Sequence, residues 1–205
     1  MEVIWFWVLW GIGDWGAMKK QSKKVVYIFI DAANLWEVQK AKAKNLDLLN
    51  LKKYLKKKHQ ATEIKVYYYD AYPKPETREY DVSGKHKFYA YLKKGLKFTV
   101  RKKPLKQIQI RSGNDVAIQE KGNMDVELTI DVVNQIKNYN EAVLFSGDSD
   151  FLALAKFVHG HNKKLFVYSS CNNISHELRT GADGYTDILQ IDDNSIWRGE
   201  IKRRG

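Results

Sequence analysis

Short apolar runs alternate with amphipathic stretches from about residue 25 to residue 191. The first run, Val25–Ile30, has no charged position and is rich in β-branched side chains, which is typical of a central strand buried on both faces. Leu48, Leu51 and Leu55 recur at helical spacing with lysines between them. The pattern predicts strands at 25–30, 63–72, 141–145 and 163–170 and two further extended pieces at 96–105 and 107–113. It predicts helices at 46–58, 85–95, 123–136 and 151–161, and a closing helix and turn at 175–188.

The order of these elements indicates the fold class. Strands alternate with helices throughout, which predicts an α/β fold, a three-layer sandwich with a mainly parallel central sheet. Gly95 is expected to end the helix at 85–95. The helix at 123–136 places Val126, Ile130 and Val133 on one apolar face, as expected of a helix that packs on a core.

The N-terminal segment differs from the rest of the chain. Its aromatic and apolar stretch is interrupted by Asp14, so it is shorter than the roughly 20 apolar residues that a membrane-spanning helix needs. It carries Glu2 where a signal peptide has positive charge, and Met18 opens a more ordinary start. We interpret residues 1–17 as a mis-assigned start or a marginal interfacial segment, and we predict one domain over residues 18–205 without stable membrane association.

Charge and cysteine content narrow the classes of function. A net charge of +11 favours a polyanionic partner, nucleic acid before an acidic membrane, although solvated lysines alone also give such a charge. The single cysteine, Cys171, excludes an internal disulfide framework and a cysteine-ligated zinc site. These features favour a reducing, cytoplasmic location, and they leave a homo-oligomer open.

Aspartates stand where several predicted strands and helices meet. Asp31 ends the first strand, and Asp148 and Asp150 end the strand in "LFSGDSDFLALA". Asp125 begins the helix at 123–136, near an N-terminus that tolerates negative charge. Carboxyl ends of neighbouring parallel strands meet at one sheet edge, and like charges gathered there need a cation to offset their repulsion. Because oxygen ligands suit hard cations, we predict a Mg²⁺ or Mn²⁺ site.

Each of these acids also has a purely structural interpretation. An aspartate after a strand is usually a helix cap or a turn residue, and this alternative stays open for every one of them. Asp131 lies about 240° around an ideal helix from Asp125, so we expect it, like Ser146, to contact the ligands and not the ion. Asn34, three residues after Asp31, is a candidate for orienting a metal-bound water or a phosphate.

Three stretches in this order resemble the NYN domain, a branch of the PIN-like nuclease fold. They are "YIFIDAANLW", "KGNMDVELTIDVV" and "LFSGDSDFLALAKFVHGHNKKLFVYS", followed by "LRTGADGYTDI" near the C-terminus. The resemblance runs from about Val25 to Ile191 and implies a metal-dependent ribonuclease with an acidic site. It assigns catalytic positions to Asp31, Asn34, Asp125, Asp148 and Asp150, and more weakly to Asp131. Met124 replaces the usual valine before the central aspartate and leaves the acid in place.

The expected reaction is hydrolysis of RNA by a metal-activated water, without a covalent protein intermediate. Single-stranded or structured RNA would be held by cations and aromatic rings near the site. Two rival classes stay open, a non-catalytic RNA-binding module and a metal-dependent phosphohydrolase acting on a small substrate. The predicted RNA contacts, each with the alternative of a solvated lysine or a core ring, are Lys121, Arg101, Lys102, Lys103, Trp36 and Tyr72.

Overall fold

Six parallel strands form the central sheet. The computed structural model describes residues 23–74, 83–112 and 115–201, so the segment 1–17 lies outside the described residues. The strands are β1 (Val25–Asp31), β3 (Glu63–Tyr72), β4 (Thr99–Pro104), β7 (Glu141–Phe145), β8 (Lys164–Ser169) and β9 (Gly184–Asp187). Their order in the sheet is β4–β3–β1–β7–β8–β9, and every neighbouring pair is parallel. The predicted α/β fold is confirmed, and this sheet is parallel throughout.

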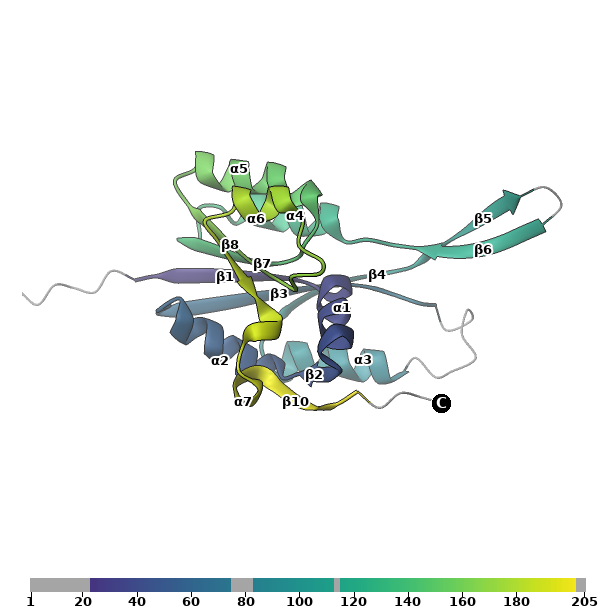
Figure 1. Ribbon diagram of the computed structural model, residues 1–205, viewed down its shortest axis with the longest axis horizontal. Helices are drawn as coiled ribbons and strands as arrows, with labels where there is room; N and C mark the ends of the chain where they lie inside the picture. The colour runs from purple at the N-terminus through teal and green to yellow at the C-terminus, as the bar shows by residue number, and fades with distance from the viewer. Residues whose placement is uncertain (1–22, 75–82, 113–114, 202–205) are drawn as a thin grey trace, which may run out of the picture.

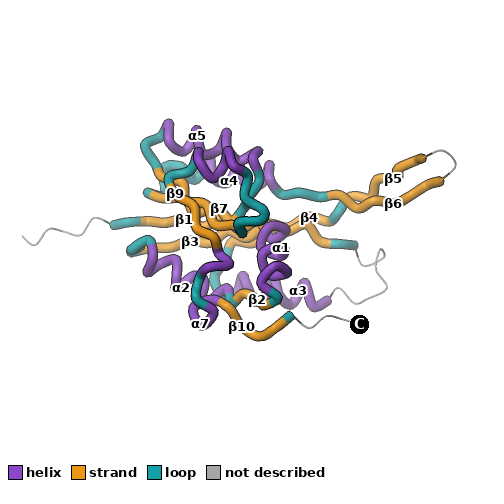
Figure 2. The backbone as a smooth tube through the Cα atoms, viewed as in Figure 1, coloured by secondary structure: helices purple, strands orange, loops and turns teal. Residues whose placement is uncertain are grey.

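Helices cover both faces of the sheet and complete the three layers (Figures 1 and 2). One face carries α1 (Ala32–Lys42), α2 (Leu48–Lys58), α3 (Ser83–Ala90), the π-helical turn η2 (Tyr91–Gly95) and α7 (Asp193–Ile196). The other carries α4 (Asp125–Asn134), the 3₁₀ turn η3 (Ser149–Phe151), α5 (Leu152–Gly160) and α6 (His176–Gly181). A second 3₁₀ turn, η4 (Ile188–Gln190), follows β9. Across the described residues, no helix combines the length and apolar character needed to cross a membrane.

Strand β1 shows why its sequence is apolar at every position. Val26, Ile28 and Ile30 belong to the core under α1, α2 and α3, whereas Tyr27 and Phe29 belong to the core under α4, α5 and α6. All five side chains are buried. Because successive side chains of a strand point to opposite faces, a strand covered on both sides needs an uninterrupted apolar run. The predicted central strand is therefore confirmed.

Two antiparallel ribbons lie outside the central sheet. A short one pairs β2 (Lys44–Leu46) with β10 (Trp197–Glu200) below α1. The other is a hairpin of β5 (Lys106–Ser112) and β6 (Asp115–Lys121), which projects from the body of the protein (Figure 1). The extended piece predicted at 107–113 is thus a strand, but one that pairs within this hairpin and not within the parallel sheet.

The predicted orientation of the helix at 123–136 is wrong. Val126 and Ile130 are 64% and 52% exposed, whereas Leu128 and Val132 are fully buried on the same helix α4. The helix has two apolar stripes, and the aromatic core above β1 and β3 takes the one that contains Leu128 and Val132. Asp131 lies on this buried face because partners on β3 and β4 satisfy its carboxylate. The periodicity argument failed because it placed the charged Asp131 on the solvent side, whereas ion pairing allows this side chain to be buried.

The strand order creates a switch point beside β1. The chain moves outward from β1 to β3 and β4, and then returns to the other side of β1 to form β7, β8 and β9. Connections on the two sides of such a point diverge, which leaves a crevice at the carboxyl ends of the strands. This edge, next to the ends of β1, β3 and β7, is where the predicted acids lie.

Candidate functional site

Three aspartates reach this edge from three different elements. Asp31 is the last residue of β1, and its Oδ1 accepts a hydrogen bond from the Ala33 N–H of α1 at 3.0 Å. Asp148 follows β7, and its Oδ1 accepts from the Asp150 N–H at 3.0 Å. Asp31 and Asp148 therefore do cap helices, as the structural alternative expected. A cap uses one oxygen for one backbone donor, so each carboxylate keeps acceptor capacity for a ligand.

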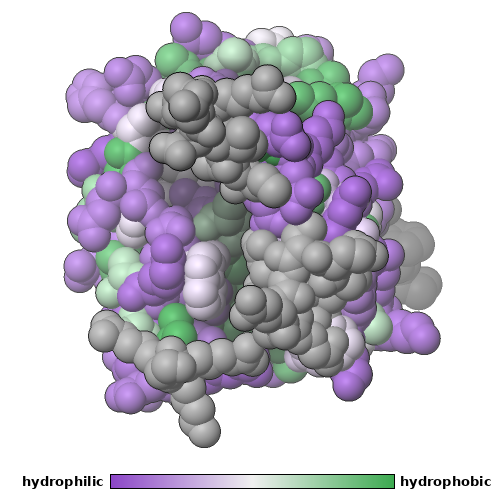
Figure 3. Space-filling view, turned by 90° about the vertical axis from the view of Figure 1, so that its right-hand side faces the viewer, coloured by the Kyte–Doolittle hydropathy of each residue, from purple (hydrophilic) through white to green (hydrophobic). Residues whose placement is uncertain are grey.

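A cavity of about 890 Å³ opens at the carboxyl edge. Its lining includes Asp31, Asp125 and Asp148, so the structure brings three of the four predicted metal ligands to one space. Asp150, the fourth, is exposed on η3 beside this group and is outside the lining. Figure 3 looks onto this edge and shows a hollow with apolar surface inside it and hydrophilic residues around it.

The field inside the cavity disfavours ionised carboxylates. Burial raises the pKa of Asp31 from its ordinary 3.8 to about 6, and the carboxylates of Asp125 and Asp70 add to the rise. Hydrogen bonding from the backbone of Ala33 acts in the opposite direction. Burial also raises the pKa of Asp125, with Asp148 and Asp150 as further causes. The acids thus repel one another, and the cavity is a region of negative potential.

Among the described residues, the four predicted metal ligands have no cationic side chain paired with them. Within the described part of the chain, no lysine or arginine forms an ion pair with Asp31, Asp125, Asp148 or Asp150. The positive charge of Lys103 favours the ionised form of Asp125, but the two side chains do not form an ion pair. Asp31 and Asp125 are half-buried, and half-buried acids that gather without a cationic partner have the electrostatic character of a cation site.

Asp70 is an acid of this cavity that the sequence analysis missed. It lies near the end of β3, lines the cavity, and is buried. Tyr89 Oη donates to Asp70 Oδ2 at 2.7 Å, and Lys85 Nζ lies 3.2 Å from the same oxygen. The signal was present, because Asp70 ends the run "VYYYD" as Asp31 ends "YIFID". Its ion pair with Lys85 distinguishes it from the other three acids.

The loop that carries Asp148 is held by close packing at Gly147. A β-carbon at this position would lie 2.7 Å from the Asn173 carbonyl carbon and 2.9 Å from Ser169 Oγ, in addition to a contact with the Asn173 carbonyl oxygen. The Gly147 carbonyl accepts a hydrogen bond from the Ser175 N–H at 2.9 Å. Ser146 is buried, and its Oγ accepts from the Asp148 N–H at 3.3 Å. Glycine is needed here for close backbone approach.

Comparison with known proteins matches most of this chain to one family, since residues 25–189 match the NYN domain. The chain belongs to the NYN domain family. The family is nuclease-like. The matched residues run from β1 into η4 and therefore include the four predicted metal ligands and Asp70.

Two relatives show how far the similarity of this NYN domain extends. The low amplitude and bright protein LabA of Synechococcus elongatus is 29% identical over 164 residues, which are 80% of this chain and 83% of LabA. A crystal structure of a protein of unknown function from Vibrio parahaemolyticus has 25% sequence identity and a TM-score of 0.63. That match covers 87% of this chain and 99% of the other chain.

Oxygen chemistry makes this part of the NYN domain suitable for a hard divalent cation. The three cavity acids offer carboxylate oxygens and uncompensated charge, which Mg²⁺ and Mn²⁺ prefer. Among the residues that the structure describes, however, no three His, Cys, Asp or Glu side chains lie close enough to hold one ion together. This spacing fits an ion bound through one or two carboxylates, with water and substrate phosphate as the other ligands, which is common for Mg²⁺.

Two further predicted residues of the NYN domain lie outside the cavity lining. Asn34 is half-buried on α1, where its Oδ1 accepts a hydrogen bond from Ser169 Oγ at 3.3 Å. It ties α1 to the end of β8 beside the acids. Asp131 is buried, and it accepts from Tyr69 Oη at 2.9 Å and from Arg101 Nε and Nη2 at 3.0 and 3.1 Å. It pairs α4 with β3 and β4 and contacts none of the predicted metal ligands through these bonds.

Three of the predicted RNA contacts already interact with side chains of the protein. Arg101 pairs with Asp131, and Lys103 Nζ pairs with Glu127 Oε1 at 2.7 Å. Lys102 Nζ lies over the rings of Tyr72 and Tyr89, 5.2 and 5.0 Å from their centroids. These three cations are largely committed to the protein itself.

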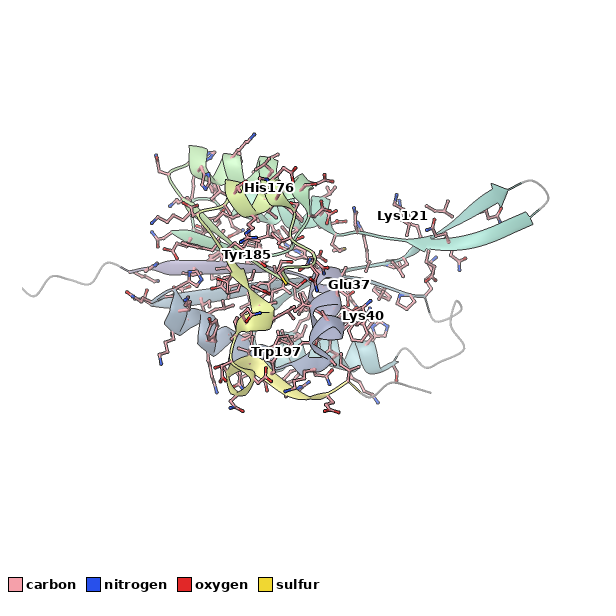
Figure 4. All side chains as sticks on the ribbon, in the orientation of Figure 1. Glu37, Lys40, Lys121, His176, Tyr185 and Trp197 are labelled. Atoms are coloured by element: carbon pink, nitrogen blue, oxygen red, sulfur yellow. The ribbon has the colours of Figure 1, made fainter. Side chains whose placement is uncertain are left out.

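Lys121 and Trp36 are more available. Lys121 is exposed at the base of the β5–β6 hairpin, where Figure 4 labels it, and its register partner across the hairpin is Lys106. Like charges directly opposite one another destabilise a ribbon, so a phosphate bound between the two lysines would offset their repulsion. Trp36 is 47% exposed and lines the cavity, whereas Tyr72 lies outside the lining.

Replacing Arg101 by alanine tests its structural assignment. We expect the free energy of unfolding to fall by about 1–3 kcal/mol, because Asp131 would keep a buried charge with Tyr69 as its remaining partner. Denaturant unfolding measures this change. RNA affinity should change by less than about twofold when compared at the same salt concentration. A stable Arg101→Ala protein with strongly weakened RNA binding would reverse the assignment.

Proposed function

We propose that this NYN domain is a divalent-metal-dependent ribonuclease that hydrolyses phosphodiester bonds of RNA. The observation that supports this most is the group of Asp31, Asp125 and Asp148 around one cavity at the switch point. These carboxylates have no ion-pair partner among the described residues, and the pKa values of Asp31 and Asp125 are raised by burial, so a site at such a point favours a cation and, with it, a phosphate ligand. The net charge of +11 favours a polyanionic substrate over a small neutral one.

The residues of the chain would hold and orient the reactants. Asp31 and Asp148 would be the direct ligands, since backbone N–H groups already fix one oxygen of each carboxylate. Asp125, held at 2.7 Å by Asn123 Nδ2, and the exposed Asp150 would bind a second ion or ordered water. A bound divalent ion supplies an activated water and stabilises charge on the phosphate. Asn34 would act by holding the start of α1 next to β8.

A covalent protein nucleophile is not needed for this reaction. The Ser146 hydroxyl is buried and contacts the backbone N–H of Asp148. The Asp187 carboxylate raises the pKa of the Cys171 thiol, which disfavours the reactive thiolate. Direct attack by water on the phosphodiester therefore fits the residues around the cavity.

A second candidate is a non-catalytic RNA-binding module. The spacing of the acids favours it, because no three of the described acidic, histidine or cysteine side chains are placed to share one ion. Such a module would bind RNA with the same affinity whether or not divalent metal is present. A ribonuclease of the proposed kind would draw its acids together when ion and RNA bind.

Cleavage of labelled single-stranded RNA, structured RNA and single-stranded DNA tests the proposal. We expect cleavage of RNA with Mg²⁺ or Mn²⁺ and none with EDTA. Asp148→Asn should lower the rate by at least about 100-fold, since even the loss of groups that merely support a ligand costs 10- to 100-fold. Asp192→Asn is the matched control, because it removes an exposed carboxylate that is outside the cavity lining.

The outcomes separate the candidates. Equal activity of wild type and Asp148→Asn would indicate a contaminating nuclease and remove support for the site. Cleavage of DNA alone would overturn the RNA assignment but keep the metal site. Tight RNA binding that is indifferent to metal, without cleavage, would establish the binding module. Hydrolysis of small phosphate esters but not of RNA would establish a phosphohydrolase.

A further inference from the structure

We propose that the cavity is a subsite for an RNA strand beyond the acidic edge, with a base against Trp36 and Tyr91 and a phosphate at Arg198. The proposal rests on the ribonuclease function above and specifies the course of its substrate. It assigns binding roles to Tyr91 and Arg198, and it gives Trp36 a defined place along the strand. Three observations support it: the length of the cavity, its two exposed rings, and its unpaired guanidinium.

The cavity extends well beyond the acids. Its lining includes Ala32 and Ala33 at the start of α1 and Asn45 and Leu46 just after its end. An 11-residue helix is about 16 Å long at 1.5 Å per residue, so the cavity follows α1 over most of its length. A single ion at the acids would occupy a small part of about 890 Å³. The remaining space is large enough for a nucleotide next to the one being cleaved.

Two aromatic rings are exposed inside this space. Trp36 on α1 and Tyr91 on η2 are each 47% exposed, and both line the cavity. Among the described residues neither has an aromatic neighbour, whereas Tyr72, Phe88 and Tyr89 pack against one another. The Tyr91 ring lies against Gly95, whose missing side chain leaves room for it. Exposed rings in a groove are the usual platforms for bases of single-stranded RNA.

Arg198 supplies the positive charge at the end of the cavity away from β1. It is exposed on β10 and lines the cavity, and no carboxylate of the described residues pairs with it. Its neighbours are committed, since Lys85 pairs with Asp70, and Lys42 and Lys44 both pair with Asp193. A guanidinium binds phosphate through two parallel hydrogen bonds, which a lysine does not provide.

The backbone that carries Arg198 is held in place. Arg198 pairs in register with Asn45 of β2, whose Nδ2 donates to the Gly199 and Glu200 carbonyls at 3.3 and 3.2 Å. Because β2 directly follows α1, Arg198 and Trp36 keep a fixed relation to the acids at the start of that helix. A strand bound at Asp31 and Asp148 would therefore meet the rings first and the guanidinium next.

Binding of a fluorescein-labelled single-stranded RNA of about eight nucleotides, measured by anisotropy in EDTA, tests the phosphate contact. We expect Arg198→Ala to weaken binding about tenfold and to reduce the slope of log Kd against log salt by about 0.7–1. Arg198→Lys should restore part of the affinity. Lys156→Ala is the matched control, because it removes one exposed charge from α5 on the opposite face of the sheet.

The ring contacts have their own test. Trp36→Ala and Tyr91→Ala should each weaken binding of the single strand about tenfold and leave duplex RNA unaffected. Ile130→Ala, which removes an exposed apolar side chain of α4, should change neither. Melting temperatures of all variants within about 2 °C of wild type would show that the fold is intact.

Failure of this inference differs from failure of the proposed function. Unchanged affinity and salt slope in Arg198→Ala, or an equal loss in Lys156→Ala, would overturn the phosphate assignment even if the protein cleaves RNA. Equal loss of duplex and single-strand binding in the ring variants would overturn the stacking assignment. Binding that depends on Arg198 and both rings, without metal-dependent cleavage, would support the subsite and overturn the ribonuclease. Absence of any RNA binding would overturn both.

Discussion

Replacing Gly147 by alanine is expected to destabilise the protein by about 2–4 kcal/mol and to abolish the function of the site. The new methyl group would meet the backbone carbonyl of Asn173, with its carbon only 2.7 Å away. That carbonyl belongs to a loop fixed by hydrogen bonds from the Asn173 and Ile174 N–H groups to the Ser170 carbonyl. Because these hydrogen bonds hold the Asn173 loop in place, the clash would displace the segment that carries Asp148.

Thermal melting and the cleavage assay measure the two consequences. A loss of this size corresponds to a fall of roughly 5–15 °C in Tm for a chain of this length. Gly160→Ala is the matched control, since a β-carbon there meets nothing within 4 Å at the end of α5. The control should be neutral or stabilising by up to about 1 kcal/mol. Similar behaviour of the two variants would contradict the packing argument.

Replacing Asp31 by asparagine is expected to stabilise the metal-free protein at pH 7 by about 1–3 kcal/mol while eliminating cleavage. The pKa of Asp31 is raised to about 6 in the folded protein from an ordinary 3.8, so ionisation above pH 6 opposes folding. Asparagine removes this charge and still caps α1 through its side-chain oxygen. The same substitution removes a predicted metal ligand, which should stop hydrolysis.

The pH dependence identifies the cause. Below about pH 4 the carboxyl is protonated in both states, and its penalty disappears. The stability advantage of Asp31→Asn, measured by denaturant unfolding in EDTA, should therefore be full above pH 6 and shrink as the pH falls through 6 toward 4. Asp192→Asn, an exposed control, should show no such trend. An advantage that does not change with pH would assign the effect to packing and not to charge.

These two expectations describe one property of the site. Gly147 and its loop hold Asp148 at the same cavity as Asp31 and Asp125, although burial, and after it the charges of neighbouring carboxylates, raises the pKa of Asp31 and Asp125. Packing elsewhere in the sheet must offset that repulsion, because the folded state tolerates it. Stability exchanged for function in this way is common at sites that bind a cation or a phosphate.

Much of the fold and part of the site follow from local sequence patterns. The apolar run before Asp31 and the run before Asp148 predict buried strands that end in acids, and the structure places both acids at the same edge. These features depend on hydrophobic periodicity and on residues next to each other in the chain. Helix α1 escaped detection because its buried residues Ala32, Leu35 and Val38 form too weak an apolar stripe.

The features that the sequence did not predict depend on contacts between distant segments. Which stripe of α4 faces the core was decided by the aromatic side chains of β1 and β3 and by the pairing of Asp131 with Arg101. The contact of Gly147 with Asn173 exists only because their loops meet at the sheet edge.

By itself, the sequence determined the fold class, five of the six strands of the central sheet and the three predicted acids of the cavity, because periodic burial and a strand's end are local properties; it did not predict β9, whose four residues are only half-buried. The tertiary structure decided which cations remain free for a ligand. Arg101 and Lys103 are committed to acids of α4, whereas Arg198, on a strand that pairs with β2, reaches the cavity without an acidic partner among the described residues. Charge pairing depends on distances in space, and the spacing of residues along the chain does not contain them.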